Sequence, residues 1–236
     1  EEEAWLAENP TLRLGYDIYW PPIEIWSEKE GLTGISADYL ARIEKILGVK
    51  VEAVAPRSWS AIMDAARDGE LDIVSAIVRR APRDEFLDFT EPYLHFPMVI
   101  ITRQDVPYIG DMRELHGKKV GVGNAYASHD FISNNHPEII LTPSSDVREG
   151  LLSVIKGETF AFVGNLAIIY HIIAREGLDN LKVSGETPYA YDLSIGVRKG
   201  ETHLLSAMQK ALDAISEEER AEIYRKWFSV TVEHKF

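Results

Sequence analysis

The chain has 236 residues, which fits one compact domain or two small lobes, because a domain typically spans roughly 100–200 residues. Hydrophobic residues make up 45% and aromatic residues 10% of the chain, enough for a packed core, so intrinsic disorder is excluded. The net charge of −13 disfavours binding to nucleic acid or to an anionic membrane. Since there is no cysteine, disulfide scaffolds, thiol nucleophiles and cysteine-ligated metal sites are excluded.

The chain contains no run of 18 apolar residues that would cross a membrane. It begins with Glu1, Glu2 and Glu3 rather than with a methionine and a signal segment. We therefore expect an excised or mature segment, with any targeting or membrane segment outside it.

Short apolar runs alternate with helical periods in the first part of the chain. Ser36 and Ser58 are the expected N-caps of two helices, and Gly48 is the expected end of the first. This alternation predicts βαβ units and a parallel sheet. In chain order, the predicted elements are a strand at 12–17, a helix at 39–47, a strand at 49–54, a helix around 61–66 and a strand at 71–77.

The same alternation of predicted strands and helices begins again after residue 100. Ser145 is an expected N-cap there, and Gly177 is an expected helix end. Two extended apolar runs, at 98–103 and 193–198, flank this second block. The pattern predicts an α/β fold of two lobes joined by two extended hinge strands, with residues 1–98 plus 195–236 in lobe 1 and 99–194 in lobe 2. The strands expected here are at 119–123, 139–141 and 160–163. The expected helices are at 126–133, from the Ser145 cap through 151–155, through 168–173 until Gly177, through 204–215 and at 217–227.

Motifs for metal, nucleotide or nucleophilic chemistry are missing. The seven histidines never pair at the i, i+4 spacing of a helical zinc site, and no nucleophile elbow or phosphate-binding loop is present. We expect no metal and no cofactor. Gly121-Val-Gly123-Asn-Ala-Tyr126 resembles a dinucleotide fingerprint, but a tyrosine replaces its third glycine. Such a turn offers backbone N–H groups that suit a carboxylate, unless it is an ordinary strand–helix turn.

Candidate binding residues follow the predicted strands, where ligands of open α/β sheets are found. We expect the site in the cleft between the two lobes. Its side chains combine aromatic rings, one cation and neutral donors. The segments are Asp17 with Trp20, Trp59, Ser75 to Arg83, Tyr126 to Ser128, and Gly164-Asn165.

Motifs along nearly the whole chain are similar to one known family. They are Gly15-Tyr-Asp17 with Trp20-Pro-Pro22, Gly34-Ile-Ser-Ala-Asp38, Gly69-Glu-Leu-Asp72, Arg83 with Phe89-Thr-Glu-Pro-Tyr93, Gly117-Lys-Lys-Val120 and Arg225-Lys-Trp227. The chain resembles the periplasmic solute-binding proteins of the polar-amino-acid type, bacterial extracellular solute-binding family 3. The resemblance implies an α/β, bilobed Venus-flytrap fold, the periplasmic-binding-protein type II fold.

Three further segments resemble a subgroup, the sensor domains that precede a membrane helix in histidine kinases and diguanylate cyclases. They are Trp5-Leu-Ala-Glu-Asn-Pro10, Val163-Gly-Asn165 and Gly185-Glu-Thr-Pro-Tyr-Ala-Tyr-Asp192.

The resemblance implies a role for individual residues. Arg83 matches the arginine that grips the ligand's carboxylate, for which a planar guanidinium is suited. The alternative is a surface ion pair of Arg83 with one of the acidic residues that follow it. Trp20 and Trp59 match the aromatic positions that sandwich the ligand's side chain from the first lobe, or are core residues. The acidic residues in question are Asp84, Glu85 and Asp88.

Backbone groups are implied in the remaining contacts. Ser75, Ala76 and Ile77 lie at the C-terminal end of the third predicted strand, where Ala76 and Ile77 would offer backbone groups, and Val78 stands near where many relatives have a hydroxyl. In the second lobe, Tyr126, Ala127 and Ser128 open a helix, and the N–H of Ala127 matches a position often held by threonine.

Asn165 departs from the family at the aspartate that receives an amino acid's α-ammonium. A neutral amide gives up a charge-assisted bond of about 1.5–3 kcal/mol for one of about 1 kcal/mol. A simple carboxylate or an aromatic acid therefore gains ground over an amino acid. Asp17 either receives an amine from the first lobe or caps the turn at Trp20-Pro21.

The leading hypothesis is a non-catalytic ligand-sensing module at the periplasmic or extracellular face of the inner membrane. Its expected partners are a small amino acid or carboxylate ligand and, through the lead-out at 229–236, a membrane helix with a cytoplasmic signalling domain of the same chain. The alternative is a receptor that delivers solute to an ABC permease. A dehydratase-type enzyme that uses Glu24 or Asp17 is a third reading.

Overall fold

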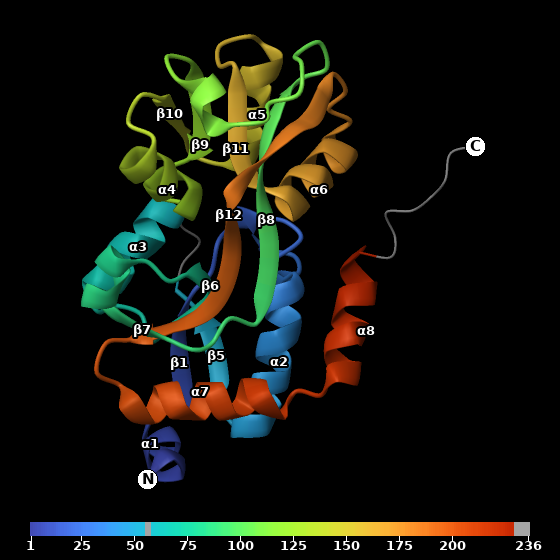
Figure 1. Cartoon of the computed structure of the whole chain (residues 1–236). Coiled ribbons are helices and arrows are strands. Elements are labelled where there is room, and N and C mark those ends of the chain that lie inside the picture. Colours follow the sequence, from blue (N-terminus) through green and yellow to red (C-terminus); the bar gives the residue numbers. More distant parts are fainter. Residues whose placement is uncertain (55–57, 229–236) are drawn as a thin grey trace. The chain divides into compact units, whose positions relative to one another are not determined.

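The computed structural model describes residues 1–54 and 58–228 (Figure 1). The contacts divide the chain into two compact units. Unit 1 contains the described residues among 1–56, 64–93 and 194–236, and unit 2 contains those among 57–63 and 94–193. The lobe boundaries expected from the sequence remain a proposal. The predicted lead-out at 229–236 lies outside the described residues.

The main sheet of unit 1 confirms the predicted βαβ units. Its strand order is β12-β6-β1-β5, and β1 pairs in parallel with both β5 and β6. All of β6 is buried, which is why that strand is apolar except for Ser75. The elements are β1 (Thr11–Gly15), α2 (Ile35–Leu47), β5 (Lys50–Ala53), α3 (Trp59–Arg67) and β6 (Ile73–Val78).

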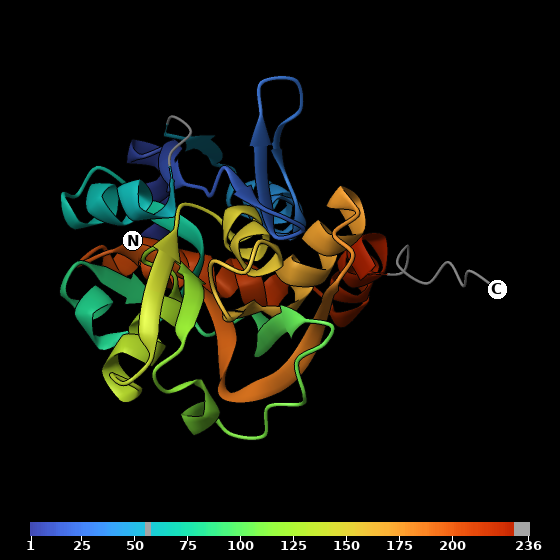
Figure 2. The same ribbon diagram turned by 90° about the horizontal axis from the view of Figure 1, so that it is seen from above.

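A second, three-stranded sheet in unit 1 has the order β2-β3-β4. It consists of β2 (Tyr19–Trp20), β3 (Glu24–Ser27) and β4 (Gly31–Thr33), with the β3–β4 hairpin drawn in blue in Figure 2. The sequence did not predict it, because strands this short carry no readable alternation. Gly34, which follows it, has φ of 115°, and a Cβ there would lie 2.3 Å from the carbonyl oxygen of Ile23. Only glycine fits that turn.

The predicted boundaries of α2 and α3 are right at two ends and wrong at one. Ser58 caps α3, accepting a hydrogen bond from the Ala61 N–H at 3.3 Å, and Gly48 ends α2 in the left-handed conformation. Ser36, however, is not the N-cap of α2, because Gly34 is. Ser36 lies inside the first turn and is buried, where its Oγ bonds the hydroxyl of Tyr93 at 3.1 Å.

Unit 2 also has a parallel core, extended by two long antiparallel strands. Strand β9 pairs in parallel with β10 and β11, β8 runs antiparallel to β11, and β12 runs antiparallel to β8. The elements are β8 (Leu94–Arg103), β9 (Lys119–Gly123), α4 (Ala127–Asn135), β10 (Ile140–Ser144), α5 (Val147–Ile155), β11 (Ala161–Asn165), α6 (Leu166–Glu176) and β12 (Leu181–Arg198).

The structure changes two predictions for this region. Asp146, not Ser145, caps α5, since its carboxylate accepts from the Glu149 N–H at 2.8 Å. The extended runs predicted at 98–103 and 193–198 are parts of the longer strands β8 and β12. Strand β12 was predicted short because register shifts, between Val183 and Gly185 and between Glu186 and Ala190, interrupt its alternation.

Helices at both ends of the described chain belong to unit 1. The two C-terminal helices were predicted, whereas α1 was not. The Glu2 carboxylate in α1 accepts hydrogen bonds from Ser206 and Lys210 of α7. These elements, with the remaining short ones, are α1 (Glu2–Glu8), η1 (Ala81–Glu85), β7 (Leu87–Phe89), η2 (Met112–Leu115), α7 (Thr202–Ala214) and α8 (Glu217–Phe228).

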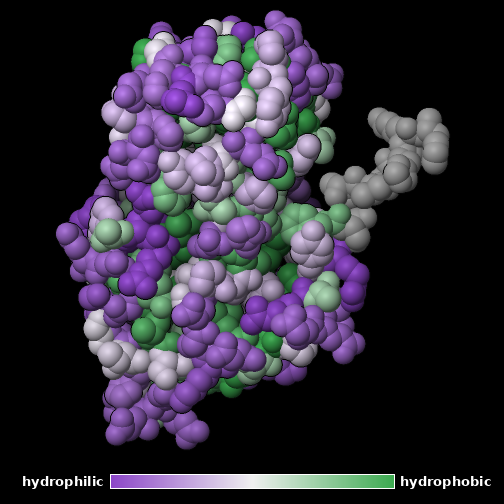
Figure 3. All heavy atoms as spheres, in the orientation of Figure 1, coloured by the Kyte–Doolittle hydropathy of each residue, from purple (hydrophilic) through white to green (hydrophobic). Residues whose placement is uncertain are grey.

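Hydrophilic side chains cover most of the face drawn in Figure 3, as the high charge content requires. Within the described residues, no helix combines the length and the apolar character that crossing a membrane demands.

Candidate functional site

In unit 2, the candidate residues gather where two neighbouring strands end. β9 and β11 pair in parallel, so the helices that follow them, α4 and α6, begin at the same edge of the sheet. Tyr126 is the N-cap of α4 and makes no side-chain capping bond. The first N–H groups of this helix, on Ala127 and Ser128, therefore belong to the set that a helix leaves without intrahelical partners. Such an edge suits an anionic group.

Two aromatic rings lie against the turn that precedes α4. The rings of Trp59 and Tyr126 stack with centroids 5.8 Å apart and planes inclined by 16°. The indole N–H of Trp59 donates to the carbonyl oxygen of Ala125 at 3.0 Å, and Ala125 has φ of 63°. A Cβ on Gly123 would lie 2.2 Å from the Tyr126 ring. The tyrosine at the third position of the dinucleotide-like motif thus packs on its second glycine.

Asn165 ends β11 and caps α6. Its Oδ1 accepts from the backbone N–H groups of Ala167 at 2.9 Å and Ile168 at 3.5 Å. These contacts fix the orientation of the amide, because only its oxygen can accept. The Nδ2 group is buried and has no hydrogen-bond partner among the described residues, and Asn165 as a whole is 1% exposed. A buried donor left unsatisfied costs about 1–3 kcal/mol.

The structure adds Tyr191 to this edge, a residue that the sequence analysis did not single out. Its hydroxyl donates to the Oγ of Ser128 at 3.1 Å, and both residues are buried. The only available signal was its place in the Gly185–Asp192 motif of the sensor subgroup.

In unit 1, Arg83 lies in η1 and is 5% exposed. Its Nη1 donates to the Val78 carbonyl oxygen, at the end of β6, at 2.6 Å. Two of its acidic sequence neighbours bond elsewhere. Asp84 pairs with Arg79 at 3.0 Å, and Asp88 pairs with Lys199 at 3.0 Å. The guanidinium is therefore held inside the fold.

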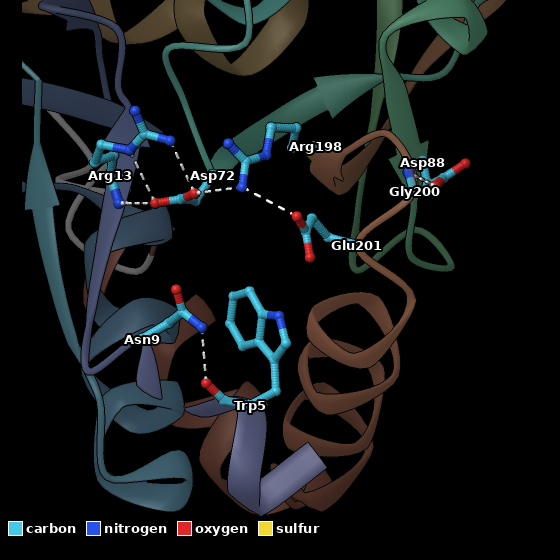
Figure 4. Close-up of polar contacts among 8 residues, drawn as sticks. All are labelled: Trp5, Asn9, Arg13, Asp72, Asp88, Arg198, Gly200 and Glu201. Carbon is cyan, nitrogen blue, oxygen red and sulfur yellow. Dashed lines mark hydrogen bonds and ion pairs between the residues drawn. The ribbon is translucent and has the colours of Figure 1, made fainter. Parts of the chain in front are cut away.

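The hydrogen bonds of Asp88, one of these acidic residues, lower the pKa of its carboxyl group. Burial acts to raise its pKa, but the hydrogen bonds from the Gly200 N–H and from Lys199 outweigh burial and lower it. The contact of Asp88 with Gly200 is drawn in Figure 4. This carboxylate fastens the segment that follows β12 through Lys199 and Gly200.

A buried network joins several candidates of unit 1 around Glu24, which is 0% exposed. The Glu24 carboxyl accepts from the Asp17 N–H at 3.1 Å and from the Ser75 hydroxyl. The Tyr93 hydroxyl donates to the Ser75 carbonyl oxygen. Burial raises the pKa of Glu24 well above its ordinary value. The Ser75 hydroxyl and both Glu24 oxygens thus serve the fold, which weakens the case for Glu24 as an acid–base catalyst.

The remaining candidates of unit 1 are buried near this network. The Asp17 carboxylate accepts from the Tyr19 N–H at 3.2 Å, the bond of a turn-capping aspartate. Trp20 is buried in β2, and Ala76 and Ile77 are buried in β6. Unit 1 thus contains Asp17, Trp20, Ser75, Ala76, Ile77 and Arg83, whereas Trp59, Tyr126, Ala127, Ser128 and Asn165 lie in unit 2.

No cluster of three or more histidine, cysteine, aspartate or glutamate side chains suited to a metal ion occurs in residues 1–54 and 58–228.

Two curated relatives with similar sequences are a sensor protein and a binding protein of an ABC transporter. The virulence sensor protein BvgS of Bordetella pertussis is 26% identical over 228 residues, covering 96% of this chain. The chain spans only 18% of the length of that sensor. The putative ABC transporter arginine-binding protein 2 of Escherichia coli is 24% identical, with 92% of this chain and 90% of that protein covered.

A solved structure supports the same relationship. The periplasmic VFT2 domain of Bordetella pertussis BvgS matches with a TM-score of 0.84 and 26% identity, covering 96% of this chain and 97% of that domain. The bilobed periplasmic-binding-protein fold expected from the sequence is thereby confirmed. The family model described as "Bacterial extracellular solute-binding proteins, family 3" matches residues 12–230. This match covers nearly the whole sequence, and the chain therefore belongs to the bacterial extracellular solute-binding proteins of family 3.

Proposed function

We propose that the chain is an extracytoplasmic sensor domain that closes around a small organic anion, an amino acid or a simple carboxylate. The observation that carries this proposal is the burial of Arg83, at the position where the family grips a carboxylate. The planar guanidinium of an arginine is suited to hold a carboxylate through two parallel hydrogen bonds, and burial strengthens such a pair.

The proposed ligand contacts come from both units. In unit 1, Arg83 fixes the carboxylate, and Asp17, Trp20 and the segment from Ser75 to Ile77 surround the ligand. In unit 2, Trp59, the start of α4 from Tyr126 to Ser128, and Asn165 complete the site. Closure follows if the ligand makes more contacts in the closed state than in the open one.

The proposed output is a signal to a membrane-bound kinase or cyclase, from the periplasmic or extracellular face of the inner membrane. The similarity to the BvgS sensor over 96% of the chain supports it. Delivery of solute to an ABC permease is the second candidate, supported by the similarity to the arginine-binding protein over 90% of that relative. Deletion of the gene separates the two, because loss of ligand uptake supports transport, whereas loss of a ligand-dependent transcriptional or cyclic-dinucleotide response supports sensing.

Binding itself is tested by calorimetry and thermal-shift screening of the chain against amino acids and small carboxylates. We expect a ligand whose binding Arg83→Ala abolishes. Arg79→Ala is the matched control, because it removes an arginine that forms an exposed pair with Asp84, and it should leave binding unchanged. If Arg83→Ala folds and binds as tightly as the native chain, the assigned site is wrong.

A further inference from the structure

The polar groups at the carboxyl edge of β9 and β11 in unit 2 present hydrogen-bond donors. The Nδ2 of Asn165 is buried without a partner among the described residues, while its Oδ1 is occupied by the N-terminal N–H groups of α6. The amide therefore offers donors and no acceptor.

The neighbouring polar groups at this edge can also donate hydrogen bonds. The Ser128 oxygen accepts from Tyr191, which leaves the proton of its own hydroxyl to be donated. Ala127 and Ser128 carry the first N–H groups of α4. The edge thus holds an amide, a hydroxyl and two backbone groups able to donate.

Two carbonyl oxygens of the adjoining turn already accept hydrogen bonds. The Ala125 carbonyl oxygen accepts from the indole of Trp59 at 3.0 Å, and the Gly123 carbonyl oxygen accepts from the Tyr126 N–H at 3.2 Å. A ligand ammonium has three protons to donate and nothing to accept with. It would leave the Asn165 donor unsatisfied and place a positive charge beside the N-termini of two helices, where a negative charge is favoured.

We propose that the ligand carries an oxygen, not an ammonium, next to its carboxylate, so that the chain selects 2-oxo or 2-hydroxy acids over the corresponding 2-amino acids. This inference rests on the proposed function, in which Arg83 holds the ligand's carboxylate. The oxygen on C2 accepts from the Asn165 Nδ2 and satisfies the buried donor.

The test uses calorimetry with sets of three acids that differ only at C2, such as phenylpyruvate, phenyllactate and phenylalanine, or 2-oxoglutarate, 2-hydroxyglutarate and glutamate. In the set with the best side chain, we expect the oxo or hydroxy acid to bind about tenfold or more tightly than the amino acid. Asn165→Asp keeps an oxygen for capping α6 and replaces the donor with an acceptor, so the preference should reverse.

Two controls keep the result specific. Asn165→Ala removes the amide donor and puts no acceptor in its place, so a folded Asn165→Ala chain should lose the preference without reversing it. Asn124→Asp makes the same chemical change at an exposed position three residues before the start of α4, and it should leave the preference intact.

The outcomes separate the two proposals. If the native chain binds the amino acid best, and Arg83→Ala abolishes that binding, the donor-edge inference is overturned and the proposed function stands. If folded Arg83→Ala binds every acid as the native chain does, or no acid binds the native chain, both are overturned.

Discussion

The carboxylate of Asp72 accepts hydrogen bonds from both the backbone and the side chain of Arg13. One oxygen accepts from the Arg13 backbone N–H at 2.8 Å and from its Nε at 3.2 Å, and the other accepts from its Nη2 at 3.2 Å (Figure 4). Arg198 approaches the same carboxylate at 3.6 Å. The contacts tie β1 and the end of β12 to the residue just before β6, and they explain structurally the aspartate of the Gly69-Glu-Leu-Asp72 motif.

Asp72→Ala should lower the free energy of unfolding by about 2–3 kcal/mol, because Asp72 is 8% exposed and the substitution leaves the Arg13 N–H without its acceptor. Denaturant unfolding measures the change. Asp64→Ala is the control, since it breaks an exposed pair with Arg67 worth at most about 1 kcal/mol. Equal losses of unfolding free energy for both variants would show that the contacts of Asp72 stabilise the chain no more than an exposed ion pair does.

Gly123→Ala should destabilise the chain by about 1–3 kcal/mol through overpacking, because its Cβ would meet the Tyr126 ring at 2.2 Å. Gly110→Ala is the matched control, since the nearest atom to a Cβ there lies at 3.6 Å. In a cycle with Tyr126→Ala, the double variant should be less destabilised than the sum of the single ones by about 1 kcal/mol or more. Strict additivity would mean that the ring is not what Gly123 accommodates.

Glu24→Gln should become more stable relative to the native chain as the pH rises. Burial raises the folded-state pKa of Glu24 above its ordinary value of 4.5, so the folded chain holds the proton more tightly than the unfolded chain does. The resulting stability is fully present below about pH 4.5 and is lost as the pH rises toward the folded pKa.

Denaturant unfolding at several pH values above 4.5 measures this effect. The unfolding free energy of Glu24→Gln minus that of the native chain should increase by up to about 1.4 kcal/mol per pH unit until the folded pKa is passed. A difference that does not change with pH would show that Glu24 titrates normally in the folded chain.

Asp146→Ala should lower the free energy of unfolding by about 1 kcal/mol, since it removes the acceptor that caps α5. Ser145→Ala, one position earlier, should cost less than about 0.5 kcal/mol, because the bond of the Ser145 hydroxyl to Glu149 is exposed. The reverse order of the two losses would restore Ser145 as the cap.

The cap of α5 also shows why sequence patterns place helices better than they place helix ends. Ser145 and Asp146 are both good caps, and only the backbone path decides which side chain reaches the Glu149 N–H. Ser36 and Gly34 present the same problem at α2, where the close approach of Ile23 requires glycine at the turn.

The sequence by itself determined the alternation of strands and helices, the parallel core strands and the family, because hydrophobic periodicity and short motifs are local properties of a chain. Tertiary structure alone decided how the candidate side chains are used. In the folded chain, the Ser75 hydroxyl donates to Glu24, and Arg83 is buried. Tertiary structure also turned the oxygen of Asn165 to α6 and left its nitrogen as a donor. Hydrogen-bond partners and burial depend on residues far apart in the chain, and no local pattern records them.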